Sequence, residues 1–392
     1  MIALRGADLV IEDRVITGAT LRINDGLIED VVPHPGEPLP GDEIIELPGY
    51  LVLPGFVDVH VHGVEGVDVL DGPDAVARVA AKLPKYGVTA FCPTSVACSP
   101  ARLTTFLSAV AAAQAAPDPA AARVLPAHLE SNFINPEWNG AQPVHCLRSY
   151  KPDRTRPEGD FAGHEILQAI VSYRSSVGIV TLAPEMPGGL DLVRDLVGAG
   201  HRVSIGHSGA TYEEAKAAID AGARHATHLF NRMSSITSRS PGVVGAVLES
   251  NLVSAEIICD GHHVHPSLIA LAIRSKSTSH VMAITDGTAV AGLPVGSTAR
   301  LGDQQIVAGE RTALLRDGTL AGSVLTMDGA FRTLVRLGFT IGEASRMCSA
   351  TPCEALGRGG NGAIAAGHQA DLVVMDRQLR VKQTWVAGRL MS

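Results

Sequence analysis

The strongest constraint on the fold of this chain is a regular alternation between short apolar segments and segments with helical spacing. Eight apolar segments read as buried strands, at residues 57–62, 88–94, 124–130, 179–185, 203–208, 225–231, 255–260 and 281–286. Between them, apolar residues such as Val76, Val79 and Leu83 recur with a helical period, and Thr211 with Glu214 forms a capping box. Eight strand–helix units in about 230 residues predict an α/β fold, a (β/α)8 barrel of the TIM type.

The two ends of the chain have a different sequence pattern from the central strand–helix units. Residues 1–52 contain short alternating stretches and a strong turn signal at Asn24-Asp25-Gly26, and residues 355–392 are similar in pattern. Neither end alone contains enough strands for a stable sheet. We therefore expect residues 1–52 and 355–392 to form one small β-sandwich domain beside a barrel domain of residues 53–354.

The composition of the chain bears on which classes of function are excluded and on the expected cellular compartment. A formal net charge of -8 argues against general binding to nucleic acid. The six cysteines are sparse for 392 residues and form no C-x-x-C pair, so we expect reduced thiols and a cytoplasmic protein. The charged first residues are unlike a signal peptide, and no uninterrupted apolar run of about 18 residues is present, so we expect no membrane span.

Ionisable residues fall at the ends of six of the eight expected strands: His60 and His62, His128 and Glu130, His207, His225 and His228, Asp260, and Asp286. The carboxyl ends of barrel strands carry the active site, and buried ionisable groups are costly unless they are paired or coordinate a metal. This set therefore predicts a metal site.

Histidine and carboxylate ligands without cysteine suit zinc, iron, manganese or a similar divalent ion. We expect His128 and His225, which are displaced from the strand ends, to pack behind the ligands rather than to bind metal. The H-x-H pair alone would equally fit one core histidine and one exposed one. No lysine ends the expected fourth strand, so a carbamylated-lysine bridge is not supported.

The chain resembles the N-acetylglucosamine-6-phosphate deacetylases of the amidohydrolase superfamily over nearly its whole length. The resemblance is carried by the stretches PGFVDVHVHG, HLESNFINPEWNGAQP, GHSGATYEEA, GARHATHLFNRMSS, TSRSPGVVGA, CDGHHVHP, ITDGTAVAG and LAGSVLTMDGAFRTLV, and by the tail GAIAAGHQADLVVMD. It implies a main divalent ion at Glu130, His207 and His228. It implies a second ion at His60 and His62, with Glu130 bridging the two.

The resemblance also implies roles around the ions. Asp286 would be the general base beside the metal, and Arg239 and His263 would bind the substrate phosphate with help from Asn231. In the family, the arginine that corresponds to Arg239 comes from the neighbouring subunit, so a homodimer is expected.

Three departures from the family pattern bear on which sugar is bound more than on the type of reaction. Ser131 and Asn132 replace Gly and Pro, and Gln142 replaces a histidine that hydrogen-bonds the substrate carbonyl. A glutamine amide can donate that bond but cannot carry a charge, so Gln142 is expected to stabilise the oxyanion. Arg232 replaces Ala beside the phosphate site, where it either strengthens anion binding or lies on the surface.

The expected function is hydrolysis of N-acetylglucosamine 6-phosphate to glucosamine 6-phosphate and acetate. One alternative is a related amidohydrolase acting on another acylamino compound, such as N-acetylgalactosamine 6-phosphate or an unphosphorylated substrate. The other is a catalytically silent barrel that serves as a binding or scaffold protein. The complete set of ligands and a general base argue against that last alternative.

Overall fold

The computed structural model describes residues 1–34, 41–152, 159–359 and 361–391. Eight parallel strands lie side by side in chain order, namely β6 (Phe56–Val61), β9 (Val88–Ser95), β11 (Ala127–Glu130), β12 (Val177–Leu182), β13 (Arg202–Ile205), β14 (His225–Ala226), β15 (Ser254–Ile258) and β16 (Val281–Ile284). The barrel closes where Val61 bridges Gly287 in parallel and the Asp286 amide donates to the His60 carbonyl at 3.0 Å. The predicted (β/α)8 barrel is confirmed.

Six of the eight expected strands are shorter than predicted, and the expected strands 124–130 and 225–231 differ most. Pro126 lacks an N–H group and separates the short strand β10 (Arg123–Val124) from β11, so the expected strand 124–130 is divided. The expected strand 225–231 ends at Ala226, because His228 and Phe230 adopt left-handed backbone conformations with φ of 31° and 80°. A strand cannot continue through such residues.

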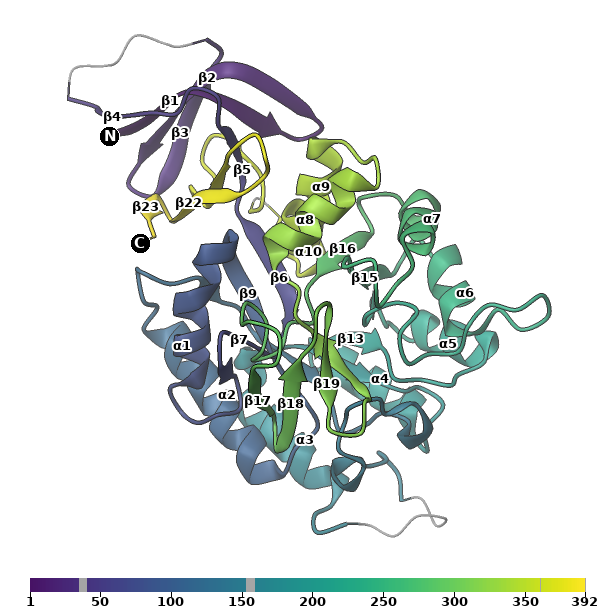
Figure 1. Cartoon of the computed structure of the whole chain (residues 1–392). Coiled ribbons are helices and arrows are strands. Elements are labelled where there is room, and N and C mark those ends of the chain that lie inside the picture. Colours follow the sequence, from purple (N-terminus) through teal and green to yellow (C-terminus); the bar gives the residue numbers. More distant parts are fainter. Residues whose placement is uncertain (35–40, 153–158, 360, 392) are drawn as a thin grey trace.

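Helices cover the outside of the barrel (Figure 1): α1 (Ala75–Lys82), α2 (Pro100–Ala115), α3 (Gly163–Ser172), α4 (Gly189–Gly198), α5 (Tyr212–Asp220), α6 (Gly242–Glu249), α7 (Pro266–Lys276), α8 (Met327–Arg336), α9 (Ile341–Cys348) and α10 (Ala350–Ala355). The expected capping box opens α5, since Thr211 accepts from the Glu214 amide at 3.2 Å and Glu214 accepts from the Thr211 amide at 2.8 Å. Within the described ranges, no helix has the length and apolar character needed to cross a membrane.

The chain ends form a separate sheet, as expected. Its strands are β1 (Ile2–Ile11), β2 (Arg14–Asn24), β3 (Leu27–Val32), β4 (Glu43–Glu46), β5 (Leu51–Pro54), β21 (Leu372–Met375), β22 (Val381–Val386) and β23 (Arg389–Leu390). Side chains alternate across β5, so Val52 packs into this sheet's own core while Leu51 and Leu53 pack into the barrel core. The sheet is thereby attached to the barrel, and the exact division at residues 52 and 355 stays a prediction.

An antiparallel sheet that the sequence analysis did not anticipate is inserted between β16 and α8. It contains β17 (Thr298–Leu301), β18 (Gln304–Ala308), β19 (Thr312–Leu315) and β20 (Leu320–Ser323), and it lies in front of the barrel in Figure 1. Gln304 donates to the Ala141 carbonyl at 2.5 Å, and the Gly302 amide donates to Asp68 at 3.2 Å. These bonds attach the insert to the loops at the barrel mouth. A shorter ribbon of β7 (Gly63–Val64) and β8 (Val67–Asp68) follows β6.

Candidate active site

Two histidines of strand β6 face the inside of the barrel at its carboxyl end. His60 and His62 are two residues apart, so their side chains share one face of the strand. Their Nε2 atoms lie 3.2 Å apart, and both residues are buried. Oδ1 of Asp286, which follows β16, lies 3.4 Å from Nε2 of His60 and 3.2 Å from Nε2 of His62. These three residues form one group of converging ligand atoms.

Glu130, at the end of β11, is the centre of a second group. Its Oε1 atom lies 2.8 Å from Nε2 of His207 and 2.9 Å from Nε2 of His228, and those two nitrogens are 3.1 Å apart. Its Oε2 atom lies 3.5 Å from Nε2 of His62. Glu130 therefore contacts both groups, as a bridging ligand would.

Three residues of these groups have strained backbones. His207, His228 and Asp286 have φ values of 48°, 31° and 49°, in the left-handed region that costs a non-glycine residue about 1–3 kcal/mol. Each follows directly or closely on a barrel strand, where the chain turns away. Such strain persists only where the surroundings hold it, and here it directs three side chains into one space.

The histidine rings are oriented by acceptors on their outer sides. Nδ1 of His62 lies 3.0 Å from the carbonyl oxygen of Thr94, and Nδ1 of His207 lies 2.8 Å from the carbonyl oxygen of Trp138. A carbonyl only accepts, so the proton occupies Nδ1 and the Nε2 lone pair points inward. Where neither of two ring nitrogens 3.1–3.2 Å apart carries a proton, their lone pairs repel unless a cation lies between them. The donor set therefore fits divalent ions, which bind nitrogen at about 2.0–2.1 Å in zinc proteins.

Two carboxylates of the cluster, Glu130 and Asp286, stay ionised. Burial alone would raise the pKa of Glu130, but its close contacts with His207 and His228 hold it well below its usual range. Burial likewise opposes ionisation of Asp286, and the nearby His60 and His62 lower its pKa below the ordinary value. Both groups are thus available as anionic ligands or proton acceptors.

The Gln142 amide is fixed with its NH2 group toward the cluster. Its oxygen accepts from the Ala97 amide at 2.8 Å, and its nitrogen donates to Oε2 of Glu130. The side chain is buried. Gln142 therefore presents an N–H donor beside the ligand groups, where a substrate carbonyl oxygen could accept a hydrogen bond from it.

A cavity of about 80 Å³ adjoins the cluster, and its wall contains Gln142, Asn231, Arg232, His263 and Asp286. The insert adds Leu301, Leu320 and Gly322 to this wall. The cavity thus brings together the candidate ligands, the candidate base and most of the expected phosphate-binding residues.

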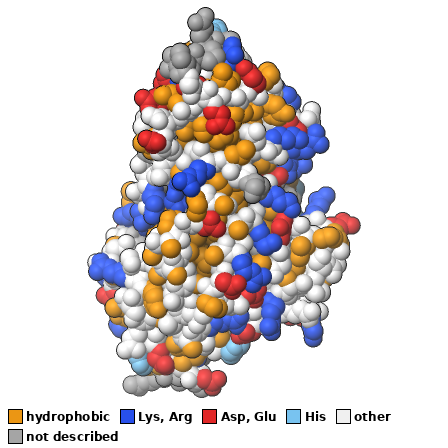
Figure 2. Space-filling model, turned by 90° about the vertical axis from the view of Figure 1, so that its left-hand side faces the viewer, with side chains coloured by type: hydrophobic (Ala, Val, Ile, Leu, Met, Phe, Trp, Pro, Cys, Tyr) orange, Lys and Arg blue, Asp and Glu red, His pale blue; other side chains and the backbone are white. Residues whose placement is uncertain are grey.

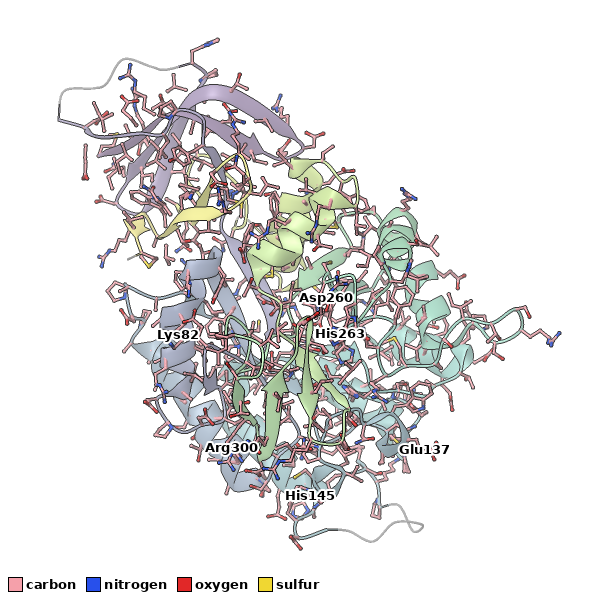
Figure 3. The ribbon with its side chains drawn as sticks, in the orientation of Figure 1. Lys82, Glu137, His145, Asp260, His263 and Arg300 are labelled. Atoms are coloured by element: carbon pink, nitrogen blue, oxygen red, sulfur yellow. The ribbon has the colours of Figure 1, made fainter. Side chains whose placement is uncertain are left out.

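His263 is held toward the cavity by Asp260, beside it near the centre of the molecule in Figure 3. Nδ1 of His263 lies 2.6 Å from Oδ2 of Asp260, whose Oδ1 accepts from two backbone amides. Nε2 of His263 is buried and has no hydrogen-bond partner in the described part of the chain. An unpartnered buried nitrogen in a cavity wall is suited to a polar ligand.

Arg239 is not brought into this cavity by its own chain. It is exposed in the segment between β14 and α6, and the cavity wall does not include it. Arg232 is exposed at the rim, with its side chain against Gly140. Because Arg232 is exposed and also lines the cavity, its expected part in anion binding stays a prediction.

Two of the sequence departures have structural roles. Ser131 donates to the Thr181 carbonyl at 2.6 Å, and Asn132 donates to the carbonyls of Cys98 and Cys146 at 2.8 and 2.7 Å. Both residues are buried. They attach the loop after β11 to its neighbours rather than face the cavity.

His225 lies outside the groups of converging ligand atoms, whereas His128 forms a third such group with His60 and Glu256. The packing role expected for both histidines stays a prediction. The two nitrogens of His128 contact the Val59 carbonyl at 3.0 Å and the Thr181 hydroxyl at 2.7 Å. Nε2 of His225 contacts the Ala355 carbonyl at 3.2 Å. Burial lowers the pKa of His128 well below its usual range and that of His225 to about 4, so both are neutral.

Two buried carboxylates near the cluster were not assigned from the sequence. Glu256 of β15 contacts Nδ1 of His60 at 3.0 Å, and Asp58 of β6 accepts from the Thr285 hydroxyl at 2.6 Å. Burial raises the pKa of Asp58 to about 7. Each is a single acid in an otherwise apolar strand, and that unusual placement is the signal that could have identified them.

A barrel with histidine and carboxylate ligands converging at its strand ends defines the class of metal-dependent barrel hydrolases. The chain belongs to the amidohydrolase family, whose model matches residues 51–391.

Among its relatives, N-acetylgalactosamine-6-phosphate deacetylase of Escherichia coli O157:H7 is 35% identical and aligns over 99% of both chains. N-acetylglucosamine-6-phosphate deacetylase of Lysinibacillus sphaericus is 33% identical over 94% of this chain and 92% of its own. A mutant N-acetyl-D-glucosamine-6-phosphate deacetylase of Mycobacterium smegmatis, solved with N-acetyl-D-glucosamine-6-phosphate, is 30% identical. It superposes with a TM-score of 0.88 over 99% of this chain and 98% of its own.

Proposed function

We propose that this chain is a metal-dependent deacetylase that converts N-acetylglucosamine 6-phosphate and water into glucosamine 6-phosphate and acetate. The observation that carries the proposal is the convergence of Asp286, Gln142 and the two ligand groups on one cavity. The names of the full-length relatives agree with this reaction.

In this proposal, Glu130, His207 and His228 hold the main ion, and His60 and His62 hold a second one beside Asp286. When bound, such an ion supplies a Lewis acid that polarises a carbonyl and lowers the pKa of water. The geometry does not distinguish zinc, iron and manganese, since all accept nitrogen and oxygen ligands.

Asp286 is the proton carrier of the reaction. Its ionised carboxylate takes a proton from the attacking water, whose oxygen bonds to the acetyl carbon. When the C–N bond breaks, Asp286 returns the proton to the amine nitrogen. Gln142 donates to the carbonyl oxygen as negative charge develops on it.

The phosphate of the substrate is bound by His263, Arg232 and Asn231 in the same cavity. Arg239 of the same chain does not reach this cavity, so in the proposed homodimer it serves the neighbouring site. Charged residues of both signs are interspersed on the face shown in Figure 2.

A cytoplasmic location is part of the proposal. The six cysteines are all buried as free thiols. Burial raises the pKa of Cys98 and Cys353 to about 12, so these two remain protonated and inert.

N-acetylgalactosamine 6-phosphate is the second candidate substrate. The observation in its favour is the relative from Escherichia coli O157:H7, which carries that name and is 35% identical over 99% of this chain. The two sugars differ only in the configuration at C4, far from the amide that reacts.

Acetate release from a panel of N-acetyl sugars, with and without the 6-phosphate, tests the proposal. We expect the highest kcat/KM for N-acetylglucosamine 6-phosphate. A higher value for the galactosamine isomer would favour the second candidate, and absence of acetate release from every member would refute both.

Variants at the phosphate site refine this test. Arg232→Ala, Arg239→Ala and His263→Ala should reduce kcat/KM for the phosphorylated sugars and leave the poor reaction of unphosphorylated sugars unchanged. Mixing Arg239→Ala chains with Asp286→Asn chains should restore part of the activity if Arg239 acts across a dimer.

A further inference from the structure

The ring of His60 is held from behind by a carboxylate that the proposed reaction does not use. Oε2 of Glu256 lies 3.0 Å from Nδ1 of His60, and both side chains are fully buried. On the other side of the ring, Nε2 faces Oδ1 of Asp286 at 3.4 Å. An ionised carboxylate only accepts hydrogen bonds, so it places the proton on Nδ1 and leaves the Nε2 lone pair facing the cluster.

Glu256 has no cation of its own among the described residues. Its Oε1 atom is buried without a hydrogen-bond partner. The nearest histidine nitrogen to that atom is Nδ1 of His128 at 3.8 Å, which contacts the Val59 carbonyl at 3.0 Å instead. A buried carboxylate is stable only when an opposite charge balances it. The ring of His60 lies between Glu256 and the cluster, so a cation bound at Nε2 of His60 would supply the balancing positive charge.

The number of carboxylates in the cluster favours two ions. Glu130, Asp286 and Glu256 are all buried at this end of the barrel, whereas one divalent ion carries only two positive charges. Glu130 contacts the rings of His207 and His228, whereas Glu256 contacts neither ring and accepts only from the His228 backbone amide, at 3.4 Å. The influence of Glu256 is therefore directed to the position of His60.

We propose that Glu256 is a positioning residue that fixes the tautomer of His60 and thereby retains a second divalent ion at His60 and His62. The inference rests on the metal centre of the proposed function and adds a residue to it. It requires a selective effect, because Glu256 contacts the ring of His60, a ligand of the second ion, at 3.0 Å and contacts no side chain among the three ligands of the main ion.

The test is a titration of metal-free protein with Zn²⁺ against a competing chelator, with bound zinc counted by elemental analysis. The wild type should bind two equivalents per chain. Glu256→Gln should bind one equivalent with unchanged affinity and the other about 10–100-fold more weakly. Glu256→Asp, which keeps the charge, should restore part of the second affinity and provides a second variant if the first does not fold.

Asp68 offers a matched control. It is a buried carboxylate at the same end of the barrel, but it accepts hydrogen bonds from the backbone amides of Leu70 and Gly302 rather than from a histidine ring. Asp68→Asn removes a buried charge without releasing a ligand, so it should bind both equivalents like the wild type.

Three outcomes would overturn the inference: wild-type protein that binds fewer than two equivalents, Glu256→Gln protein with both wild-type affinities, or equal weakening of both equivalents. The same selective loss in Asp68→Asn would also overturn it, by showing a general effect of charge. Acetate release is measured separately. If the protein binds two ions and Glu256→Gln has the expected effect, but no acetate is released, the proposed function is refuted and this inference stands.

Discussion

Oδ1 of Asp286 lies 3.2 Å from Nε2 of His62, at the edge of the cavity where a substrate amide would be attacked. Asp286→Asn keeps the shape of the side chain but removes the proton acceptor. We expect kcat to fall by about 10²–10⁴, the usual contribution of a general base. Zinc bound at Glu130, His207 and His228 should be retained, which elemental analysis would show. Near-normal turnover in this variant would contradict the assignment of the base.

Gln142 should contribute to kcat through its amide donor. Removal of a single oxyanion donor typically costs about 10²–10³ in kcat, so Gln142→Ala should be impaired but active. Gln142→Glu, which has a similar size but accepts instead of donating, should be at least as impaired. The measurement is steady-state acetate release at saturating substrate. If both variants kept wild-type kcat, the amide would have no role in the transition state.

The barrel and the grouping of the candidate ligands were predictable because both depend on local patterns. The apolar strands repeat along the chain, and residues such as His60, His207 and Asp286 fall at their carboxyl ends, where a barrel must bring them together. No distance between strands is needed for that inference. The pairing of the chain ends was predictable for a related reason, because neither end could form a stable sheet alone.

The parts that were missed depend on long-range contacts. Strands β17 to β20 are short and partly exposed, so their apolar pattern is weak, and only their contacts with the barrel mouth explain them. The early end of β14 is set by the left-handed backbone conformations of His228 and Phe230. Glu256 lies inside a strand, and its partner His60 is 196 residues away in the sequence.

Removal of the metal should reduce the stability of the chain as well as its activity. Without ions, the nitrogens of His207 and His228 remain 3.1 Å apart in a buried site. A ligand that binds only the folded state stabilises it by about 2.7 kcal/mol at a free concentration 100-fold above its Kd. Chelation followed by zinc addition should therefore lower and then restore the thermal midpoint. Equal midpoints with and without zinc would contradict a folded-state metal site.

His225 should make the metal-free protein sensitive to acid. It is buried against the Ala355 carbonyl, and burial lowers its pKa from 6.5 to about 4. Between those pH values the unfolded chain binds a proton that the folded chain does not, so the free energy of unfolding falls as the pH falls from 6.5 to 4. The full shift corresponds to about 3 kcal/mol.

His225→Gln can still donate to the carbonyl but does not titrate, so it should lose less stability over this range. Urea unfolding of metal-free protein at several pH values measures the difference, with the exposed His164→Gln as the control. The same acid sensitivity in His225→Gln and wild type would show that other groups are responsible.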